Sequence, residues 1–367
     1  MKIFIDGMLF RHTGMGRIYE NLLDVLIRSD EVERISTLVP SWMEQAFRNR
    51  FSSNKVSARF TGLPNNFKEY LYKGQIINRE FQRQDIYHFV SSNVPFFLRG
   101  KVISTVCDLI TISPLFGLPW HRRWRFEYPV RHAIGRSNHV VCISEFTKSE
   151  VCRTFGTSSA KLSVIYPPLA FPDAQDDGDT PPVAGDYLLF VGNRHVHKNL
   201  RCLFTALSLL TPEFPDLKIV VAGARMKQFD DVDRALENPL LRDRIVSVQN
   251  AGDDEIQRLY NHARAFVFAS LVEGFGIPPL EALHTGIPTI CSDIPVLREV
   301  CGNSVYYANP QDPVDFARKI REALTVVSTE AQVLAGRAHA LKYATGCHAK
   351  RRPKSAGFSD PKSDRHF

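Results

Sequence analysis

Two glutamates separated by seven residues form the stretch of this chain with the clearest chemical potential. They are Glu273 and Glu281, in the sequence VEGFGIPPLE at residues 272–281. Two glycines and two prolines lie between them, so the interval cannot be one continuous helix, and Glu273 is expected on a loop. Pro279 suits the first position of a helix, where its missing N–H costs nothing. This places Glu281 in the first helical turn.

The surrounding residues predict a strand, a loop and a helix in succession. The apolar run 265–269 has the pattern of a buried strand. A glycine loop that leads into a helix offers free N–H groups and the positive end of the helix dipole to an anion. We expect a phosphate to be held by three successive amides, those of Phe275, Gly276 and Ile277. Glu281 would accept two ribose hydroxyls, and Glu273 would face the group beyond the phosphate. An ordinary connection with two exposed acids explains the glutamate pair equally well.

A second candidate loop has the sequence GNRHVHKN at residues 192–199 and follows an expected strand at 187–191. Arg194 and Lys198 stand in it, just before a helix. Cations in that place can neutralise a diphosphate, because arginine offers a bidentate fork and lysine a compact charge. Two surface cations near a turn are the plainer alternative.

Both stretches resemble signatures of one known family. The glutamate pair resembles the E-x7-E signature of the retaining, nucleotide-sugar-dependent glycosyltransferases of family four, which have the GT-B fold. The loop 192–199 resembles that family's diphosphate-binding loop, in a form common among bacterial polysaccharide mannosyltransferases. The resemblance covers about residues 1–330 and is more specific in the second half of the chain.

The resemblance implies a role for each candidate residue. Lys198 and Arg194 would stabilise the departing diphosphate. Glu273 would hydrogen-bond the donor sugar, and Glu281 the ribose. His197 occupies a position that is often arginine in the family and would contribute less. Such catalysis could run through an ion-pair intermediate without a metal or other cofactor, and no residue is assigned as nucleophile.

A third candidate loop lies near the start of the chain, after an expected strand at 2–6. The sequence TGMGR at residues 13–17 opens an amphipathic helix, and it looks like the first-domain loop of the same family. Gly14 and Gly16 would therefore close on the donor phosphates. The sequence is a poor dinucleotide fingerprint, because Tyr19 stands where the third glycine belongs. This departure disfavours a nicotinamide dehydrogenase.

After the expected strand 101–107 the family often shows His-Asp-Leu, with the histidine lining the site. Here the residues are Cys107, Asp108 and Leu109. A thiol cannot reproduce the hydrogen bonding of imidazole, so we take Asp108 as a candidate catalytic group. His88 ends an earlier strand near the same edge, and a structural role is favoured for it over a catalytic one.

The alternation of strands and helices predicts an α/β protein with two Rossmann-like, doubly wound parallel-sheet domains, which the GT-B resemblance places face to face across a cleft. We expect an N-terminal acceptor-side domain at 1–166, a proline-rich linker at 167–186, a C-terminal donor-binding domain at 187–344 and a disordered basic tail at 345–367. Strands are expected at 2–6, 34–39, 86–90, 101–107, 139–143, 162–165, 187–191, 218–222, 245–248, 265–268, 288–292 and 305–308. Ser144 is expected to cap a helix.

The charge of the chain is unevenly divided. Residues 1–170 carry 23 Lys and Arg against 14 Asp and Glu, whereas residues 171–340 carry 16 against 23. The basic half favours an anionic membrane face or a phosphate-bearing acceptor, and no spacing typical of nucleic-acid-binding motifs supports nucleic acid as a partner. The stretch 120–128 mixes cations with aromatic residues, as an interfacial membrane contact does; a helix packed on the protein is the equal alternative.

Neither a signal peptide nor a membrane span is predicted, and the seven scattered cysteines are typical of a reducing compartment. A cytoplasmic location is therefore expected, and peripheral association with the cytoplasmic face of the inner membrane is compatible with it. We therefore expect a retaining glycosyltransferase that moves a hexose, most simply mannose from GDP-mannose, to a lipid-linked surface-polysaccharide or oligosaccharide acceptor. A UDP- or dTDP-sugar donor, or a catalytically silent nucleotide-sugar-binding scaffold, are the alternatives.

Overall fold

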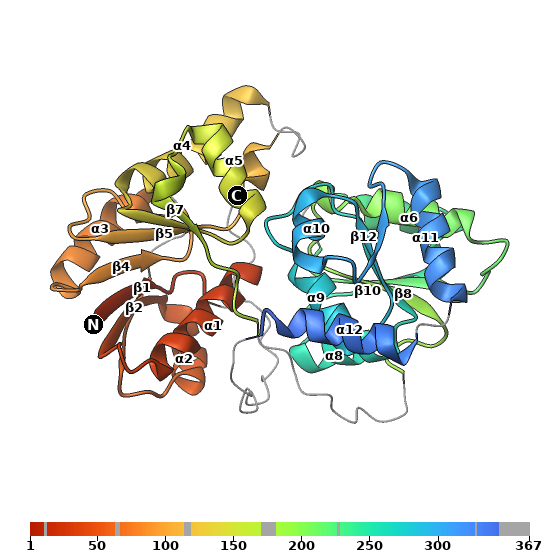
Figure 1. The fold of residues 1–367 in the computed structure, drawn as a ribbon, viewed down its shortest axis with the longest axis horizontal. Helices are drawn as coiled ribbons and strands as arrows, with labels where there is room; N and C mark the ends of the chain where they lie inside the picture. The colour runs from red at the N-terminus through yellow and green to blue at the C-terminus, as the bar shows by residue number, and fades with distance from the viewer. Residues whose placement is uncertain are drawn as a thin grey trace. The chain divides into compact units, whose positions relative to one another are not determined.

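The computed structural model of the 367-residue chain describes residues 1–10, 13–62, 67–113, 119–169, 181–225, 228–326 and 329–344. The chain divides into two compact units (Figure 1). The first comprises Met1–Ala170 with Tyr343–Cys347, and the second comprises Phe171–Lys342 with His348–Phe367. Most of the expected linker, residues 170–180, and the expected tail, 345–367, lie outside the described residues.

The first unit is built on a seven-stranded sheet in the order β3-β2-β1-β4-β5-β6-β7, with every neighbouring pair parallel. The sheet order turns between β1 and β4, because the chain builds first to one side of β1 and then to the other. The strands are β1 (Lys2–Asp6), β2 (Arg34–Pro40), β3 (Val56–Thr61), β4 (Ile86–Phe89), β5 (Val102–Val106), β6 (His139–Cys142) and β7 (Leu162–Val164).

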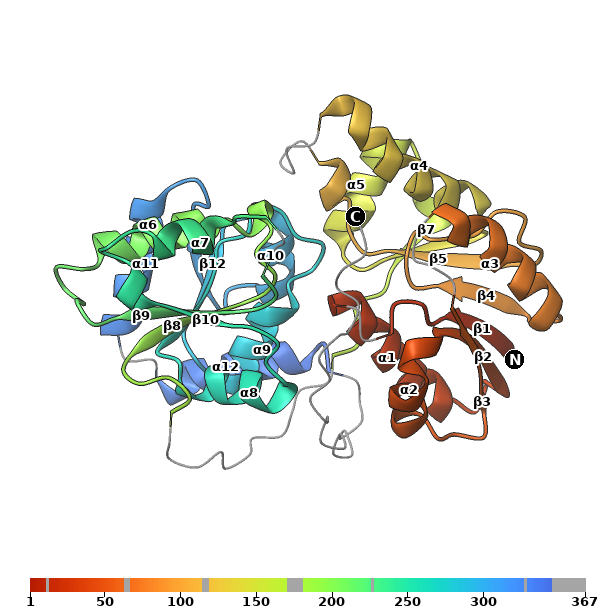
Figure 2. The same ribbon diagram turned by 180° about the vertical axis from the view of Figure 1, so that it is seen from behind.

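Helices cover both faces of this sheet. They are α1 (Thr13–Arg28), α2 (Glu44–Arg50), α3 (Phe67–Glu80), α4 (Trp120–Arg136) and α5 (Glu145–Phe155). Ile77 of α3 and Ala133 of α4 share an apolar cluster with Phe4 and Phe89, so these two helices pack on the same face. Figures 1 and 2 show α1 and α2 on the opposite face. The burial of these apolar side chains against the sheet is the main stabilising term of the unit.

A buried ion pair joins α3 to the end of β1. Lys73 Nζ lies 2.6 Å from Asp6 Oδ2, and both side chains are almost fully buried. The ammonium also lies over the ring of Phe89, 5.6 Å from its centroid. Because removal of one partner would leave a buried charge unpaired, this contact fixes the position of α3 on the sheet.

The second unit contains a six-stranded sheet in the order β10-β9-β8-β11-β12-β13, again with all pairs parallel. Its order turns between β8 and β11, which are neighbours in the sheet. The strands are β8 (Tyr187–Val191), β9 (Lys218–Ala222), β10 (Ile245–Val248), β11 (Ala265–Phe268), β12 (Thr289–Ser292) and β13 (Tyr306–Ala308).

The helices of the second unit form two groups. Helix α6 packs against α11, while α8 and α12 pack against α9, and Figure 1 shows the two groups on opposite faces of the sheet. The helices are α6 (Leu200–Leu209), α7 (Asp231–Leu236), α8 (Asp253–His262), α9 (Ile277–Thr285), α10 (Pro295–Cys301), α11 (Pro313–Thr325) and α12 (Glu330–Leu341). None of the helices in the described part of the chain is long and apolar enough to cross a membrane.

The strands that the sequence predicts are present, with ends that differ by no more than one residue. The expected cap is confirmed as well, since Ser144 accepts a hydrogen bond from Thr147 N, 3.0 Å away, at the start of α5. Strand β3 was not predicted. Its side chains are mostly half-buried and its sequence, VSARFT, has no apolar run to mark it.

One boundary differs from the predicted domains. Residues up to 344 were expected in the second domain, but Tyr343 and Ala344 group with the first unit. Leu169 N donates to Tyr343 O at 2.9 Å, and the rings of Tyr166 and Tyr343 meet edge to face with centroids 5.3 Å apart. The backbone pairing and the aromatic contact hold this short segment where sequence position alone would not place it.

The ends of β8 and β9 approach so closely that one position admits only glycine. A Cβ atom added to Gly223 would lie 1.8 Å from the carbonyl oxygen of Gly192. We expect Gly223→Ala to destabilise the second unit by about 1–3 kcal/mol, because the backbone of one strand end must move. Urea unfolding would measure the loss. As a control, Gly135→Ala in α4, where the added methyl group meets no atom within 4 Å, should be neutral or slightly stabilising; equal behaviour of the two variants would contradict the prediction.

Candidate active site

The candidate residues of the second unit meet at the turning point of its sheet. The loop that carries Lys198 follows β8, and the loop that carries Glu273 follows β11. Because β8 and β11 are parallel neighbours, both loops leave the same edge of the sheet. Leu271 N donates to His197 O at 2.8 Å and joins the loops through their backbones. The carboxyl edge at such a turning point is where open α/β sheets bind ligands.

Asn199 fastens the first loop to its surroundings. Its backbone is left-handed, with φ 57°, a conformation that asparagine tolerates better than most residues. Its side-chain amide donates to Ala269 O at 3.1 Å and to Pro310 O at 2.7 Å. The sequence analysis gave Asn199 no role. Its place directly after Lys198 and before a helix was the available signal, but the two acceptors lie 70 and 111 residues away and could not be found locally.

The two charged residues assigned to the donor lie in direct contact. Lys198 Nζ is 2.5 Å from Glu273 Oε1, and the side chains are only 12% and 9% exposed. The ammonium also lies over the ring of Phe268, with 5.2 Å to its centroid. Glu273 is on a loop, as predicted. The structure thus brings a cation and a carboxylate together at the edge of the sheet, largely removed from water.

Glu281 lies farther along α9 than the sequence predicted. The helix begins at Ile277, so Glu281 is its fifth residue and not part of the first turn. The helix starts early because Gly276, with φ 107°, turns the chain at its N-cap, where a side chain would meet Leu297 at 2.7 Å. Tyr260 of α8 donates its hydroxyl to Glu281 Oε2 at 3.1 Å and to Pro278 O at 3.3 Å. Tyr260 is therefore a second residue that the sequence analysis missed.

The start of α9 has few N–H groups to offer an anion. Pro278 and Pro279 occupy its second and third positions, and proline has no N–H. In the first turn of the helix only Ile277 can donate to a ligand, and Gly276 and Phe275 precede it. The phosphate contacts expected of these three amides therefore stay a prediction. The two prolines that follow cannot add a donor to them.

Arg194 makes contacts within the sheet framework of the second unit. Its guanidinium lies 3.6 Å from Asp230 Oδ2 and donates to the hydroxyl of Ser247 in β10. Asp230 also caps α7 through the backbone N–H groups of Val232 and Asp233. Arg194 is only 4% exposed. These contacts link β8, β10 and α7, while the predicted contact of Arg194 with a diphosphate stays a prediction.

Two histidines, His195 and His197, precede the lysine of this loop. The rings of His195 and His197 stack at 5.6 Å between centroids and 19° between planes. Burial and the neighbouring charge of Lys198 lower the pKa of His197 to about 4, against an opposing effect of Glu273. The pKa of His195 is lowered by the same two causes. His197 is therefore uncharged at neutral pH, which fits the smaller role expected for it.

The two candidate glycines of the first unit, Gly14 and Gly16, lie within a helix. The sequence analysis placed Gly14 and Gly16 on a loop before α1, but α1 begins at Thr13 and includes both in its first turn. Tyr19, which interrupts the fingerprint, is fully buried, and its hydroxyl lies 2.8 Å from that of Thr37 in β2. The large side chain of Tyr19 prevents the close packing of helix against strand that a third glycine allows. A contact of Gly14 and Gly16 with donor phosphates stays a prediction.

The candidate residues after β5 serve the local fold. Asp108 Oδ1 accepts from Ile110 N at 3.0 Å and so caps the following turn. The Cys107 thiol is buried and points to Val90 O at 3.8 Å; burial raises its pKa, so it stays protonated. His88 Nε2 lies 2.9 Å from Thr105 Oγ1, and burial lowers its pKa to about 4. The contact with Thr105 agrees with the structural role favoured for His88, and both that role and a catalytic role of Asp108 stay predictions.

Comparison with known proteins identifies families and individual proteins that this chain resembles in sequence. Residues 13–169 match the family described as Glycosyltransferase Family 4, and residues 176–333 match Glycosyl transferases group 1. The chain is 28% identical to the O-antigen chain mannosyltransferase RfbU of Salmonella typhimurium over 196 residues, 53% of this chain and 54% of that protein. It is 27% identical to O-antigen chain mannosyltransferase B of Escherichia coli over 257 residues, 66% of each. The chain thus spans between half and two thirds of these relatives.

Solved structures share the fold over nearly the whole chain. HepE from Anabaena, in complex with UDP and glucose, superposes with a TM-score of 0.72 at 15% identity and covers 94% of this chain and 95% of its own. The lipopolysaccharide outer core galactosyltransferase WaaB gives 0.64 at 17% identity and covers 94% and 96%. The chain has two doubly wound units with all-parallel sheets and superposes on these structures, so it has the GT-B fold. The solved structures show the fold alone, and it is the matches to both units, 13–169 and 176–333, that show that the chain belongs to the family-four glycosyltransferases.

The buried, uncharged histidine beside Lys198 predicts a pH dependence of stability. The unfolded chain binds a proton at His197 as the pH falls below the ordinary pKa of 6.5, whereas the folded chain binds it only near its lowered pKa of about 4. Stability should therefore fall as the pH drops from about 6.5 to about 4, by roughly 2–3 kcal/mol from this residue. His88 adds a similar dependence in the first unit. Urea unfolding at pH 7 and pH 4.5 should show a smaller loss in His197→Gln than in the wild type, whereas His121→Gln at an exposed site should not change it. The same loss in all three proteins would contradict this account.

Proposed function

We propose that this protein is a retaining hexosyltransferase that uses a nucleoside-diphosphate sugar. The observation that carries the proposal is the contact between Lys198 and Glu273 at the carboxyl edge of β8 and β11. Transfer of a sugar from a diphosphate needs a positive charge at the leaving group and a group that accepts hydrogen bonds from the sugar hydroxyls. The contact supplies both groups within 2.5 Å of each other.

Lys198 stabilises the charge that develops on the diphosphate as its bond to the sugar breaks. The ammonium is largely shielded from water, where its attraction to an anion is stronger than in bulk solvent. The backbone tether from His197 O to Leu271 N and the two bonds of Asn199 hold it in place before the donor arrives. A preorganised cation of this kind is worth several kcal/mol in the transition state.

Glu273 and Glu281 hold the sugar and the ribose. A carboxylate accepts hydrogen bonds from neighbouring hydroxyls and therefore fixes the ring that it contacts. Glu273 accepts from the donor sugar through the oxygen not engaged by Lys198, and Glu281 accepts from the ribose. Retention follows when the acceptor hydroxyl attacks from the face that the diphosphate leaves, through a short-lived ion pair. The departing diphosphate takes up the proton of that hydroxyl.

The reaction proposed here needs no metal ion, since Lys198 and the amides before α9 neutralise the leaving group. The donor is GDP-mannose and the acceptor a lipid-linked surface polysaccharide; both proposals rest on the likeness to O-antigen chain mannosyltransferases. The fold neighbour HepE was solved in complex with UDP and glucose, so a UDP-sugar is the donor to compare with GDP-mannose.

A donor screen with the purified full chain tests this function. We would measure thermal stabilisation and nucleotide release with GDP-mannose, UDP-glucose, UDP-N-acetylglucosamine and dTDP-rhamnose, each with and without EDTA. Stabilisation by GDP-mannose and slow, EDTA-resistant release of GDP are expected. Stabilisation by another donor would replace the donor assignment. Loss of release in EDTA would overturn metal independence, and failure to bind any of the four would overturn the proposal.

Substitution of Lys198 tests the leaving-group role. Lys198→Met keeps the length of the side chain and removes its charge, so turnover should fall more than tenfold. Steady-state kinetics with the preferred donor would measure it, and an unchanged rate would exclude the role. Because this variant leaves the buried Glu273 unpaired, a loss of fold could mimic the effect. The double variant Lys198→Met with Glu273→Gln serves as control, since it should recover the thermal stability but not the turnover.

Substitution of Glu281 tests the ribose contact. Glu281→Ala removes the acceptor of the ribose hydroxyls and should weaken nucleotide binding roughly tenfold to hundredfold, because each bond to a charged group contributes about 1.5–3 kcal/mol. Calorimetry with the free nucleoside diphosphate would measure the affinity. Tyr260→Phe is the matched control: it removes only the hydroxyl that bonds Glu281 and should have a smaller effect. Wild-type affinity in Glu281→Ala would remove this residue from the site.

A further inference from the structure

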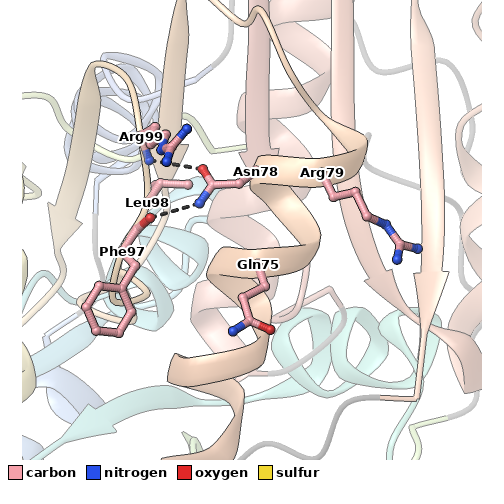
Figure 3. A pocket seen from close by; sticks show the side chains of 6 residues that line it. All are labelled: Gln75, Asn78, Arg79, Phe97, Leu98 and Arg99. Carbon is pink, nitrogen blue, oxygen red and sulfur yellow. Dashed lines mark hydrogen bonds between the residues drawn. The ribbon is translucent and has the colours of Figure 1, made fainter.

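An open cavity of about 620 Å³ lies on the first unit. Figure 3 shows it between α3 and the segment that follows β4. Its lining is cationic and polar, with one exposed aromatic ring: Gln75, Asn78, Arg79, Phe97, Leu98 and Arg99. No residue proposed for sugar transfer lines this cavity.

The aromatic residue at its rim has an unusual conformation. Phe97 has a left-handed backbone with φ 61°, and its side chain is 79% exposed. A bulky residue in this region costs about 1–3 kcal/mol, and the exposed ring recovers none of it by burial in the chain. A strained backbone that presents an exposed aromatic ring is a reason to look for a role outside the fold.

Asn78 holds this conformation. Its side-chain amide donates to Phe97 O at 2.8 Å, and its Oδ1 accepts from Arg99 N at 3.0 Å, as the dashed lines in Figure 3 show. One side chain thus bonds the backbone on both sides of Leu98. The bonds fix the backbone from which the Phe97 ring and the Arg99 side chain project.

Two helices make the segment rigid. A Cβ atom at Gly74 of α3 would lie 2.3 Å from Phe96 O, so the helix and the segment are in backbone contact there. From the other side, Arg136 of α4 donates to Leu98 O and Gly100 O. The ring of Phe96 packs on His132 of α4, with 4.5 Å between centroids. The exposed ring of Phe97 is therefore presented by a fixed support.

Helix α4, which contacts the segment, has exposed aromatic and basic residues of its own. Trp124, Tyr128 and Arg131 recur at helical spacing and are 61%, 49% and 57% exposed. Tyr128 reaches the segment, since its ring centroid is 6.4 Å from that of Phe96. We name the exposed residues of α3, the segment and α4 the aromatic and arginine surface: Arg79, Phe97, Arg99, Trp124, Tyr128 and Arg131.

Arginines outnumber acidic residues along α4, although Arg131 and Arg79 are each paired with a glutamate. Helix α4 contains five arginines and one glutamate, Glu127, which is itself bonded to Arg131. Arg79 is paired with Glu80 at 3.2 Å but remains 81% exposed. Aromatic rings with polar edges favour the boundary between lipid and water, and arginines next to them attract anionic headgroups.

We propose that the aromatic and arginine surface docks the first unit on a bilayer that contains anionic lipids. Phe97 enters the interfacial layer, Trp124 and Tyr128 lie at headgroup level, and the arginines bind lipid phosphates, with Arg79 and Arg99 at the mouth of the cavity. The choice of a bilayer rests on the proposed function, because a lipid-linked acceptor is presented at a membrane. Single-stranded nucleic acid also binds aromatic residues and arginine, so it is an outcome of the test.

The experiment is co-sedimentation of the full chain with vesicles of phosphatidylethanolamine and phosphatidylglycerol, and with vesicles of phosphatidylcholine alone. Binding to the anionic vesicles is expected, weaker in 0.5 M salt because the charges are screened. Phe97→Asn keeps a residue that tolerates the left-handed backbone and removes the ring, so binding should fall at least about fivefold. Arg99→Ser should cause a similar loss, about fivefold for one cation.

The matched control is Leu240→Asn, which removes an equally exposed apolar side chain, 76% exposed, from the second unit. It should bind vesicles as the wild type does. Wild-type binding by Phe97→Asn, or an equal loss in Leu240→Asn, would overturn the proposal, as would failure of the wild type to bind anionic vesicles. Tighter binding to a single-stranded oligonucleotide, lost in Phe97→Asn, would replace the bilayer by nucleic acid.

Donor affinity separates this proposal from the proposed function. Phe97→Asn should bind the nucleoside diphosphate as the wild type does, because Phe97 lies outside the donor site. If no donor binds and vesicle binding still depends on Phe97, the sugar-transfer proposal fails and the docking surface stands. If the donor is bound and turned over but vesicles are not bound, the docking surface fails alone.

Discussion

The ion pair between Lys198 and Glu273 is the interaction on which the site depends. Two opposite charges that are almost out of water must remain together, since either alone would be strongly destabilising. Their loops come from strands that are distant in sequence but adjacent in the sheet. The backbone bond between His197 and Leu271 and the two bonds of Asn199 hold those loops in register. The topology of the sheet therefore places the chemistry, and the loop contacts refine it.

The same architecture occurs in the first unit with a different result. There the sheet turns between β1 and β4, and the strand end at the turn carries Asp6, whose charge is satisfied by the fully buried Lys73. The pair in the second unit lies in loops beyond the strand ends, whereas the pair in the first lies inside the core. Burial inside the core makes one pair structural, whereas the other lies at the carboxyl edge of the sheet, where we propose that the donor binds. The two units share a fold and differ in what their strand ends do.

The sequence predicted most of the strands and the two loops that carry Lys198 and Glu273, because buried strands are marked by apolar runs and each motif is local. It placed the start of α9 two residues late, since the left-handed Gly276 that begins the helix cannot be told from a loop glycine by composition. It gave Arg194 only a ligand role, because Asp230 and Ser247 approach it through the fold. Strand β3 escaped detection because its side chains are mostly half-buried. The contact of Lys198 with Glu273, across 75 residues, needed the sheet order.

The return of Tyr343 to the first unit has a consequence for the integrity of the chain. Helix α12 packs on α9 in the second unit, and two residues beyond its end the backbone is bonded to Leu169. The polypeptide therefore passes from one unit to the other near residue 170 and back again after α12. A protease that cut only the segment after Ala170 would leave two polypeptides held together by non-covalent contacts, among them the bond between Leu169 and Tyr343. In the nicked protein, residues 343 and 344 would contribute to the first unit as part of the other polypeptide.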